Sequence, residues 1–285
     1  MTERASPVPP FFLFVHGAWH GAAHWDRVRA VLAAAGCRSA AIDLPGSGPA
    51  AALPRAYETQ DLDELVREPS PLAHVTLEDQ AAAIVAEIER QQAAHGPVVV
   101  VAHSAGGLPA TSAVERVPDR VSRIVYVAAH CPVALATLSG YLGLPESAAA
   151  QLGPLFLGEP GVLGAVRINP RAADPGYQEA LRQGFYSDLG AAEARPFIAR
   201  LTPDLPLRVA TDEVRVSAQR WGRVRRTYVR TLADRALPLA LQDRLIAEAD
   251  ALTPHNRFEV HSLDCGHSPF ASCPGALAAL LHPLP

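Results

Sequence analysis

The sequence predicts an α/β fold in which a mostly parallel sheet of about six strands is flanked by helices and interrupted by an inserted helical lid. Short apolar runs that lead into loops alternate with segments of helical periodicity in the first half of the chain, and the alternation returns near the C-terminus. The long stretch between these two regions lacks this alternation of strands and helices. A parallel crossover needs only about a dozen residues, so the surplus indicates an insertion.

The first half of the chain predicts four strands. Residues 11–15, FFLFV, form an apolar run that enters a glycine-rich loop. A helix over residues 23–35 follows, with Gly36 as a natural stop. The other predicted strands of this half are residues 38–43, 98–101 and 124–129.

Between the second and third strands, residues 44–75 are weakly periodic, which predicts an excursion with one short helix over 61–67. Thr76, followed three residues later by Asp79, then predicts a capped helix start. Helical spacing also follows residues 102–106 and continues to Val117.

The lid is expected over residues 131–224, inserted between core segments 1–130 and 225–285. Periodicity predicts helices in the lid near residues 134–142, 147–157, 175–185 and 191–201. The sheet is expected to resume with the elements that complete the fold, namely a strand over 227–232, a helix over 239–249, a strand over 257–263 and a helix over 274–281.

Composition excludes several classes of protein. The chain of 285 residues is 49% hydrophobic, enough for a full core, and its net charge of −4 argues against nucleic-acid binding. No segment is long and apolar enough for a signal peptide or a membrane span. We expect a cytoplasmic protein without metal or cofactor. The cysteines are expected to be free thiols, a Cys265–Cys273 disulfide being the alternative.

Ser104 is the candidate nucleophile. It follows a run of four valines and stands in AHSAG, a small–x–Ser–x–small motif between a predicted strand and a predicted helix. A strained turn of this kind holds the hydroxyl clear of the backbone. Ala102 stands where glycine is usual, but the turn requires only a small residue. The alternative is a buried serine at a glycine-rich turn.

A serine hydroxyl becomes nucleophilic when a base accepts its proton and a carboxylate orients that base. His267 follows the last predicted strand and is the candidate base. Asp234 follows the preceding strand and gives the chain order Ser, acid, His. Asp264 is its chief competitor and Asp212 a weaker one, but Asp264 is so near the histidine that a single turning loop seldom gives the required geometry. Asp234 could also be a helix N-cap.

Acyl transfer also needs two backbone N–H groups directed at the developing oxyanion. Ala105 follows the nucleophile at the start of its helix and supplies one candidate. Ala18, in the loop after the first strand, supplies the other. The alternative for this loop is a simple tight turn.

The motifs HGAWHGAAHW, AHSAGG, TLADRALP and DCGHSPF occur in this order along nearly the whole chain. Together they resemble the α/β-hydrolase fold family, and within it the branch of plant methylesterases and hydroxynitrile lyases with their bacterial relatives. The resemblance implies Ser104 as nucleophile, Asp234 as acid and His267 as base. It implies Ala18 and Ala105 as the oxyanion donors.

Lyase members of this branch carry a threonine at the position of Ala18 and a lysine at the position of Ser268. Without a cation for departing cyanide, the resemblance implies an esterase. We expect a serine hydrolase for a small to medium, uncharged, largely apolar carboxylic ester. The alternatives are a carbon–carbon hydrolase, a lyase, a polyketide-tailoring enzyme, and a non-enzymatic ligand-binding relative. Relatives often dimerise, so a homodimer remains open.

Aromatic residues of the lid and of the loop after the first strand are candidate pocket walls, although such residues are more often plain core. No arginine or lysine stands out beside the motifs, which argues against a carboxylate- or phosphate-bearing substrate. The candidate walls are Trp19, Phe156, Phe185, Tyr186 and Trp221.

Overall fold

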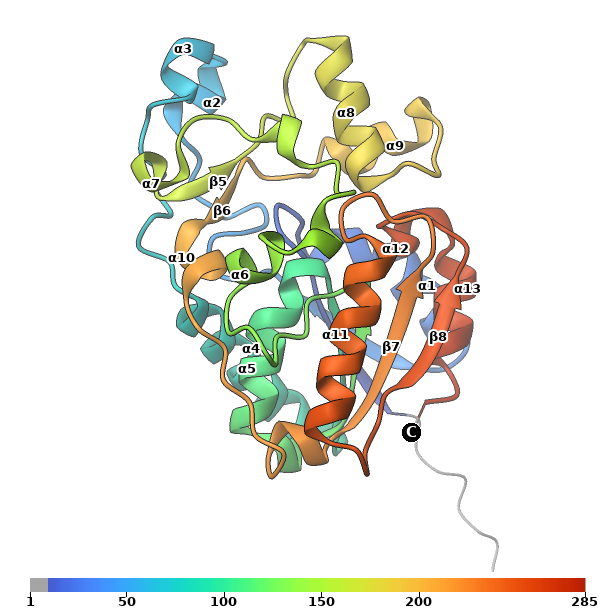
Figure 1. Ribbon diagram of the computed structural model, residues 1–285. Helices are drawn as coiled ribbons and strands as arrows, with labels where there is room; N and C mark the ends of the chain where they lie inside the picture. The colour runs from blue at the N-terminus through green and yellow to red at the C-terminus, as the bar shows by residue number, and fades with distance from the viewer. Residues whose placement is uncertain (1–9, 285) are drawn as a thin grey trace, which may run out of the picture.

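In the computed structural model, which describes residues 10–284, the core is a six-stranded sheet in the order β2–β1–β3–β4–β7–β8 (Figure 1). Every pairing in this sheet is parallel. The predicted α/β class and strand number are therefore confirmed. The strands are β1 Phe11–Val15, β2 Arg38–Ile42, β3 Val98–His103, β4 Val121–Val127, β7 Arg225–Thr231 and β8 Glu259–Leu263.

Helices cover both faces of the sheet. The core helices are α1 Asp26–Ala34, α4 Leu77–His95, α5 Gly107–Arg116, α11 Leu239–Leu252, α12 Pro269–Ser272 and α13 Pro274–Leu281. Phe12 and Phe14 of β1 pack in the same cluster as side chains of α1 and α13. Leu13 and Val15 pack in the cluster that contains side chains of α4 and α5. Burial on both faces explains why this strand is continuously apolar rather than alternating.

The excursion between β2 and α4 contains two short helices, α2 Arg55–Thr59 and α3 Leu62–Leu65, where one was predicted. Gln60 lies between them with a left-handed backbone, φ 57°, which ends α2. At the start of α4, Thr76 Oγ1 accepts from the backbone N–H of Asp79 at 3.0 Å. The Asp79 carboxylate accepts in return from the N–H of Thr76 at 2.9 Å, so the predicted capped start is confirmed.

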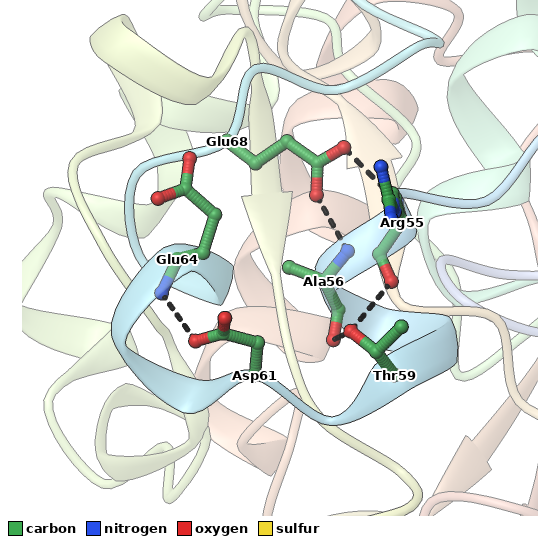
Figure 2. Close-up of a pocket in the computed structure, with 6 residues that line it drawn as sticks. All are labelled: Arg55, Ala56, Thr59, Asp61, Glu64 and Glu68. Carbon is green, nitrogen blue, oxygen red and sulfur yellow. Dashed lines mark hydrogen bonds between the residues drawn. The ribbon is translucent and has the colours of Figure 1, made fainter.

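An open hollow of about 710 Å³ lies over these two helices (Figure 2). The Glu68 carboxylate in this hollow accepts from the backbone N–H groups of Arg55 and Ala56. Asp61 accepts from the N–H of Glu64 at 3.1 Å. Because these two carboxylates already cap helix starts, we interpret the hollow as a structural feature of the excursion.

The segment between β4 and β7 differs from its prediction. The helix predicted near 175–185 is present as α8, but the one near 147–157 is wrong, because glycine and proline interrupt it and leave two short 3-10 turns. An unpredicted antiparallel pair, β5–β6, also occurs here. The longer elements of this segment are α6 Leu138–Leu142, α7 Pro160–Leu163, β5 Ala165–Arg167, α8 Pro175–Phe185, α9 Ala191–Ile198, β6 Asp204–Pro206 and α10 Leu207–Thr211.

The helices α2, α3, α7, α8 and α9 and the pair β5–β6 lie beyond the ends toward which β7 and β8 point, and α6 and α10 lie closer to α4 and α5 (Figure 1). The boundaries proposed for a separate lid stay a prediction. Residues 1–9 and 285 of the proposed core segments lie outside the described residues. Among the helices of residues 10–284, none is both long and apolar enough to cross a membrane. All four cysteines are free thiols in the structure.

A buried ion pair joins the inserted segment to the excursion. Arg167 of β5 donates from Nε and Nη2 to the two carboxylate oxygens of Asp204 of β6, at 2.7 and 2.8 Å. Its Nη1 donates to the backbone carbonyls of Leu65 and Glu68 at 2.7 and 2.8 Å. Both charged side chains are fully buried, so neither can be compensated by solvent if the other is removed.

We therefore expect Arg167→Met to lower the free energy of unfolding by about 3–5 kcal/mol, because it leaves the Asp204 carboxylate buried without its partner. Urea unfolding followed by circular dichroism measures this change. The double variant Arg167→Met, Asp204→Leu should recover much of the loss, since no lone charge remains. As a control, Arg215→Ala removes the exposed Arg215–Glu213 pair and should cost at most about 1 kcal/mol. If Arg167→Met and Arg215→Ala lowered the free energy of unfolding equally, the interpretation of the Arg167–Asp204 pair as a buried, mutually compensating ion pair would be contradicted.

Candidate active site

Ser104 lies on a strained turn between β3 and α5. Its backbone is left-handed, with φ 51°, which is rare for a non-glycine residue. The two glycines that follow are required by close packing. A Cβ atom on Gly106 would lie 2.1 Å from the carbonyl oxygen of His16, and one on Gly107 would lie 2.0 Å from that of His130. The motif AHSAGG therefore has glycine at the two positions where the chain after β1 and the chain after β4 pack against the turn.

The structure brings Ser104 together with His267 and Asp234. His267 Nε2 lies 3.0 Å from Ser104 Oγ, and His267 Nδ1 lies 2.9 Å from Asp234 Oδ2. Because a carboxylate only accepts, it favours the tautomer with the proton on Nδ1. Nε2 is then free to accept the serine proton, which is the arrangement of a nucleophile, a base and an orienting acid.

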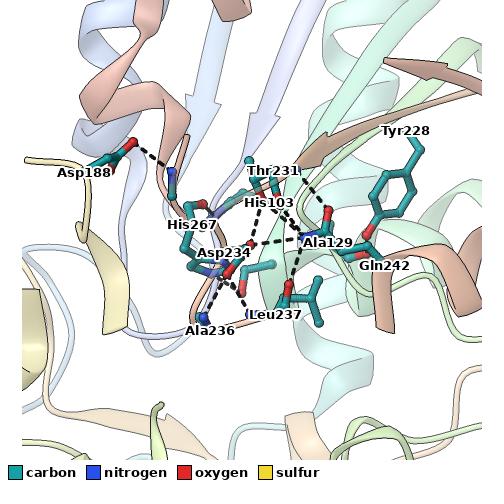
Figure 3. A network of polar contacts seen from close by, with 12 residues as sticks. His103, Ala129, Asp188, Tyr228, Thr231, Asp234, Ala236, Leu237, Gln242 and His267 are labelled. Carbon is teal, nitrogen blue, oxygen red and sulfur yellow. Dashed lines mark hydrogen bonds and ion pairs between the residues drawn. The ribbon is translucent and has the colours of Figure 1, made fainter. Parts of the chain in front are cut away.

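Asp234 is held by several donors. Its Oδ1 accepts from the backbone N–H groups of Ala236 and Leu237, each at 2.8 Å. Thr231 Oγ1 donates to Oδ2 at 2.7 Å. Figure 3 shows these partners converging on the carboxylate, whose side chain is fully buried. Asp264, the chief competitor for the role of acid, is exposed.

The loop that carries His267 is fixed by two contacts that the sequence did not predict. The N–H of Gly266 donates to Asp188 Oδ2 at 2.8 Å. His103 Nε2 donates to the carbonyl oxygen of His267 at 2.9 Å. The sequence predicted no role for Asp188, which lies between α8 and α9 and belongs to no motif. His103 directly precedes Ser104 in the sequence, and that position is the signal by which it could have been found.

The candidate oxyanion donors lie beside Ser104. Ala18 and Ala105 line the same pocket as the serine. A Cβ atom on Gly17 would lie 2.7 Å from the Cβ of Ser104, so the loop after β1 is in close contact with the turn. Within residues 10–284, neither the Ala18 nor the Ala105 N–H forms a backbone hydrogen bond. Both donors are therefore available to a ligand.

The pocket has a volume of about 300 Å³ and is mostly apolar. Trp19 and Phe156 line it, with ring centroids 6.0 Å apart. Phe185 packs behind Trp19, at 5.6 Å between centroids. Tyr186 is buried further away, where its hydroxyl contacts His20 Nε2 at 3.0 Å. Of the predicted wall residues, Trp19 and Phe156 line the pocket, whereas Phe185 and Tyr186 lie in the layer behind it.

The prediction that Trp221 forms a pocket wall is wrong. Its side chain is fully buried, and its Nε1 donates to the hydroxyl of Tyr126 at 2.9 Å. The guanidinium of Arg226 lies 4.3 Å from the centre of its ring. Trp221 precedes the amino end of β7, whereas Ser104 and the pocket lie at the carboxyl ends of the strands. Because Trp221 closely precedes the strand expected over residues 227–232, its order in the chain already places it near the amino end of that strand.

Comparisons with known proteins identify similar hydrolases. A family model described as the alpha/beta hydrolase family matches residues 12–280. A putative chloroplastic methylesterase 15 of Arabidopsis thaliana is 26% identical over 276 residues, which cover 95% of this chain but only 55% of that protein. A pheophorbidase of Raphanus sativus is 27% identical over 271 residues, covering 95% of this chain and 92% of that protein.

Among solved structures, a pyrethroid hydrolase from Sphingobium faniae superimposes with a TM-score of 0.75. The match covers 95% of each chain at 22% sequence identity. This likeness concerns the fold. The expected fold family is thus supported by both the sequence and the structure.

Histidines are concentrated in the buried region around Ser104. Burial lowers the pKa of His24 to about 4 and the pKa of His130 to about 3. Burial is also the main reason why the pKa values of His16, His20 and His103 are lowered. These five rings are therefore neutral in the folded protein near neutral pH.

Stability should fall as the pH drops below about 6.5, the pKa of an unfolded histidine. In this range the unfolded chain binds protons that the five buried rings cannot bind, so the stabilisation is complete above about 6.5 and is lost toward the folded-state pKa values. His24 and His130, whose pKa values in the folded protein are about 4 and about 3, should each contribute a slope of about 1.4 kcal/mol per pH unit across this range. Urea unfolding between pH 7 and 4.5 measures this slope.

The matched variants for this measurement are His24→Gln and His255→Gln. The first removes a buried ring and should reduce the slope, whereas the second removes an exposed histidine and should leave it unchanged. A free energy of unfolding that does not change between pH 7 and 5 would contradict the prediction.

Proposed function

Because the chain belongs to the alpha/beta hydrolase family, we propose that it is a serine ester hydrolase for a small to medium, uncharged and largely apolar carboxylic ester. The observation that carries the proposal is the continuous hydrogen-bonded chain from Ser104 through His267 to Asp234, beside an apolar pocket. The names of similar proteins, among them methylesterases and esterases, support the same reaction class.

In the proposed mechanism, Ser104 Oγ attacks the ester carbonyl carbon while His267 Nε2 accepts the hydroxyl proton. The carbonyl oxygen becomes an oxyanion, which accepts from the N–H groups of Ala18 and Ala105. His267 then donates the proton to the leaving alcohol, and an acyl-enzyme remains. Water, deprotonated by the same ring, releases the acid and restores Ser104. Asp234 stabilises the imidazolium in both steps.

The substrate class follows from the lining of the pocket. None of the described residues that line it carries a charged side chain, and most are aliphatic or aromatic. A charged substrate group would lose its hydration there without a partner, which is costly. The volume of about 300 Å³ accommodates a small or medium apolar group.

The lyase alternative is not favoured. Ser268, at the position where lyase relatives carry lysine, is fully buried, and its Oγ has no hydrogen-bond partner. A neutral hydroxyl cannot neutralise a departing cyanide as an ammonium group would.

Three further properties stay predictions. Cell fractionation would test the cytoplasmic location, sedimentation would test the homodimer, and hydrogen exchange would test the action of the inserted segment as a lid.

The first test is acyl-enzyme formation. With p-nitrophenyl acetate, the wild-type protein should release a rapid burst of nitrophenolate, and Ser104→Ala should abolish it and lower the turnover rate by about 10⁴-fold or more. Ser122→Ala, a half-buried serine of β4, is the matched control and should retain the burst. A burst of wild-type size in Ser104→Ala would refute the proposal.

The second test separates the two candidate acids. Asp234→Asn should lower kcat by about 10⁴-fold, since an amide favours the wrong tautomer of His267. Asp264→Asn changes an exposed carboxylate and should leave kcat within about twofold of wild type. Steady-state kinetics on p-nitrophenyl butyrate measures both. A greater loss in Asp264→Asn than in Asp234→Asn would reverse the assignment.

A further inference from the structure

His130 occupies a fixed position beside the nucleophile. Its backbone N–H donates to the carbonyl oxygen of Ser104 at 3.0 Å, and its own carbonyl oxygen packs against Gly107. Ala128, two residues earlier, has a left-handed backbone with φ 42°, although it is not a glycine. Such strain persists only where the surrounding structure imposes it. The chain after β4 is therefore held firmly against the turn that carries the serine.

His130 is one of the residues that line the pocket, and it is only 5% exposed. Its Nδ1 atom is fully buried without a hydrogen-bond partner. Nε2 is not among the fully buried, unpartnered polar atoms and forms no hydrogen bond with a described residue, so it is the ring nitrogen left for a ligand. Because a buried N–H without an acceptor is costly, the ring proton is favoured on Nε2, where a ligand can accept it.

The other polar side chains of the pocket wall are already engaged. Trp19 Nε1 donates to the carbonyl oxygen of Val166 at 3.0 Å. Ser147 Oγ donates to the carbonyl oxygen of Tyr141 at 2.8 Å. Ser104 is paired with His267. Among the described residues that line the cavity, His130 is therefore the one whose side chain offers an uncommitted hydrogen bond to a ligand.

We infer that His130 is a specificity-determining residue, which selects esters that carry an uncharged oxygen acceptor on the apolar group that enters the pocket. The acceptor would be a hydroxyl, keto or ether oxygen bound by His130 Nε2–H. Burial lowers the pKa of His130 to about 3, so the ring stays neutral and favours an uncharged partner over a carboxylate. This inference rests on the proposed ester hydrolase function and specifies its substrate.

The test compares ester pairs that differ in one oxygen. Methyl mandelate is paired with methyl phenylacetate, methyl benzoylacetate with methyl hydrocinnamate, and phenoxyethyl acetate with phenylpropyl acetate. These pairs place the oxygen at two positions on the acyl side and at one on the alcohol side. For at least one pair, wild type should prefer the oxygen-bearing ester in kcat/KM by about tenfold or more.

His130→Phe keeps a ring of similar size but removes both nitrogens, so that preference should fall to about one, whereas His130→Gln should restore part of it. Leu138→Ala, which changes the pocket wall without changing a hydrogen bond, should alter both members of each pair alike. Thermal unfolding confirms that each variant is folded. If no pair changes its ratio between wild type and His130→Phe, the inference is overturned.

Binding separates this inference from the proposed reaction. Calorimetry on Ser104→Ala and on Ser104→Ala, His130→Phe measures affinity for the same pairs without turnover. A preference in Kd that disappears with His130→Phe supports the role of His130 even if the wild type hydrolyses none of the esters, in which case the proposed function alone fails. Equal Kd ratios in the two variants, together with normal hydrolysis by wild type, overturn the inference alone.

Discussion

The close packing of one turn against the ends of two neighbouring strands is the constraint on which the site depends. The backbone of His16, after β1, touches Gly106, and the backbone of His130, after β4, touches Gly107. Any larger residue at either glycine would push these chains apart. The same contacts set the strained backbone of Ser104 between them, and they bring both adjoining loops to the serine. The candidate nucleophile Ser104, the loop of the candidate oxyanion donor Ala18 and the pocket residue His130 are thus positioned together.

The second requirement is a buried carboxylate whose oxygens are fully hydrogen-bonded. Asp234 meets it through two backbone N–H groups and the Thr231 hydroxyl, which replace its lost hydration. Around it, His103 and His130 remain neutral because burial lowers the pKa of each ring. Charged neighbours would oppose formation of the imidazolium at His267, and neutral ones do not. The buried histidines therefore provide packing and hydrogen bonds without adding positive charge.

The sheet and the candidate site residues at its strand ends could be predicted from the sequence. Strands and helices leave periodic patterns, and the carboxyl ends of parallel strands meet at one edge of the sheet. That rule alone brings Ser104, Asp234 and His267 to the same edge. The pair β5–β6 could not be predicted, since strands of three residues show no period. Trp221 was misplaced because it falls within the predicted lid range, although the chain has already returned to the amino end of β7 at that point. Asp188 acts through a single backbone contact, which leaves no motif.

The core and the inserted segment contribute different parts of the site. Ser104, His267, Asp234 and the candidate oxyanion donors all come from loops of the core, whereas the inserted segment contributes Leu138, Phe156 and Val166 to the pocket lining. Substitutions in the insertion can therefore reshape the pocket while the hydrogen-bonded chain at Ser104 stays intact. His130 lies on the core side of the pocket, as Trp19 and Ala236 do, and its backbone N–H donates to the carbonyl oxygen of Ser104 itself. The proposed preference for an oxygen acceptor depends on His130, whose position is fixed by its contact with Ser104. This preference should therefore persist when the apolar walls of the pocket change.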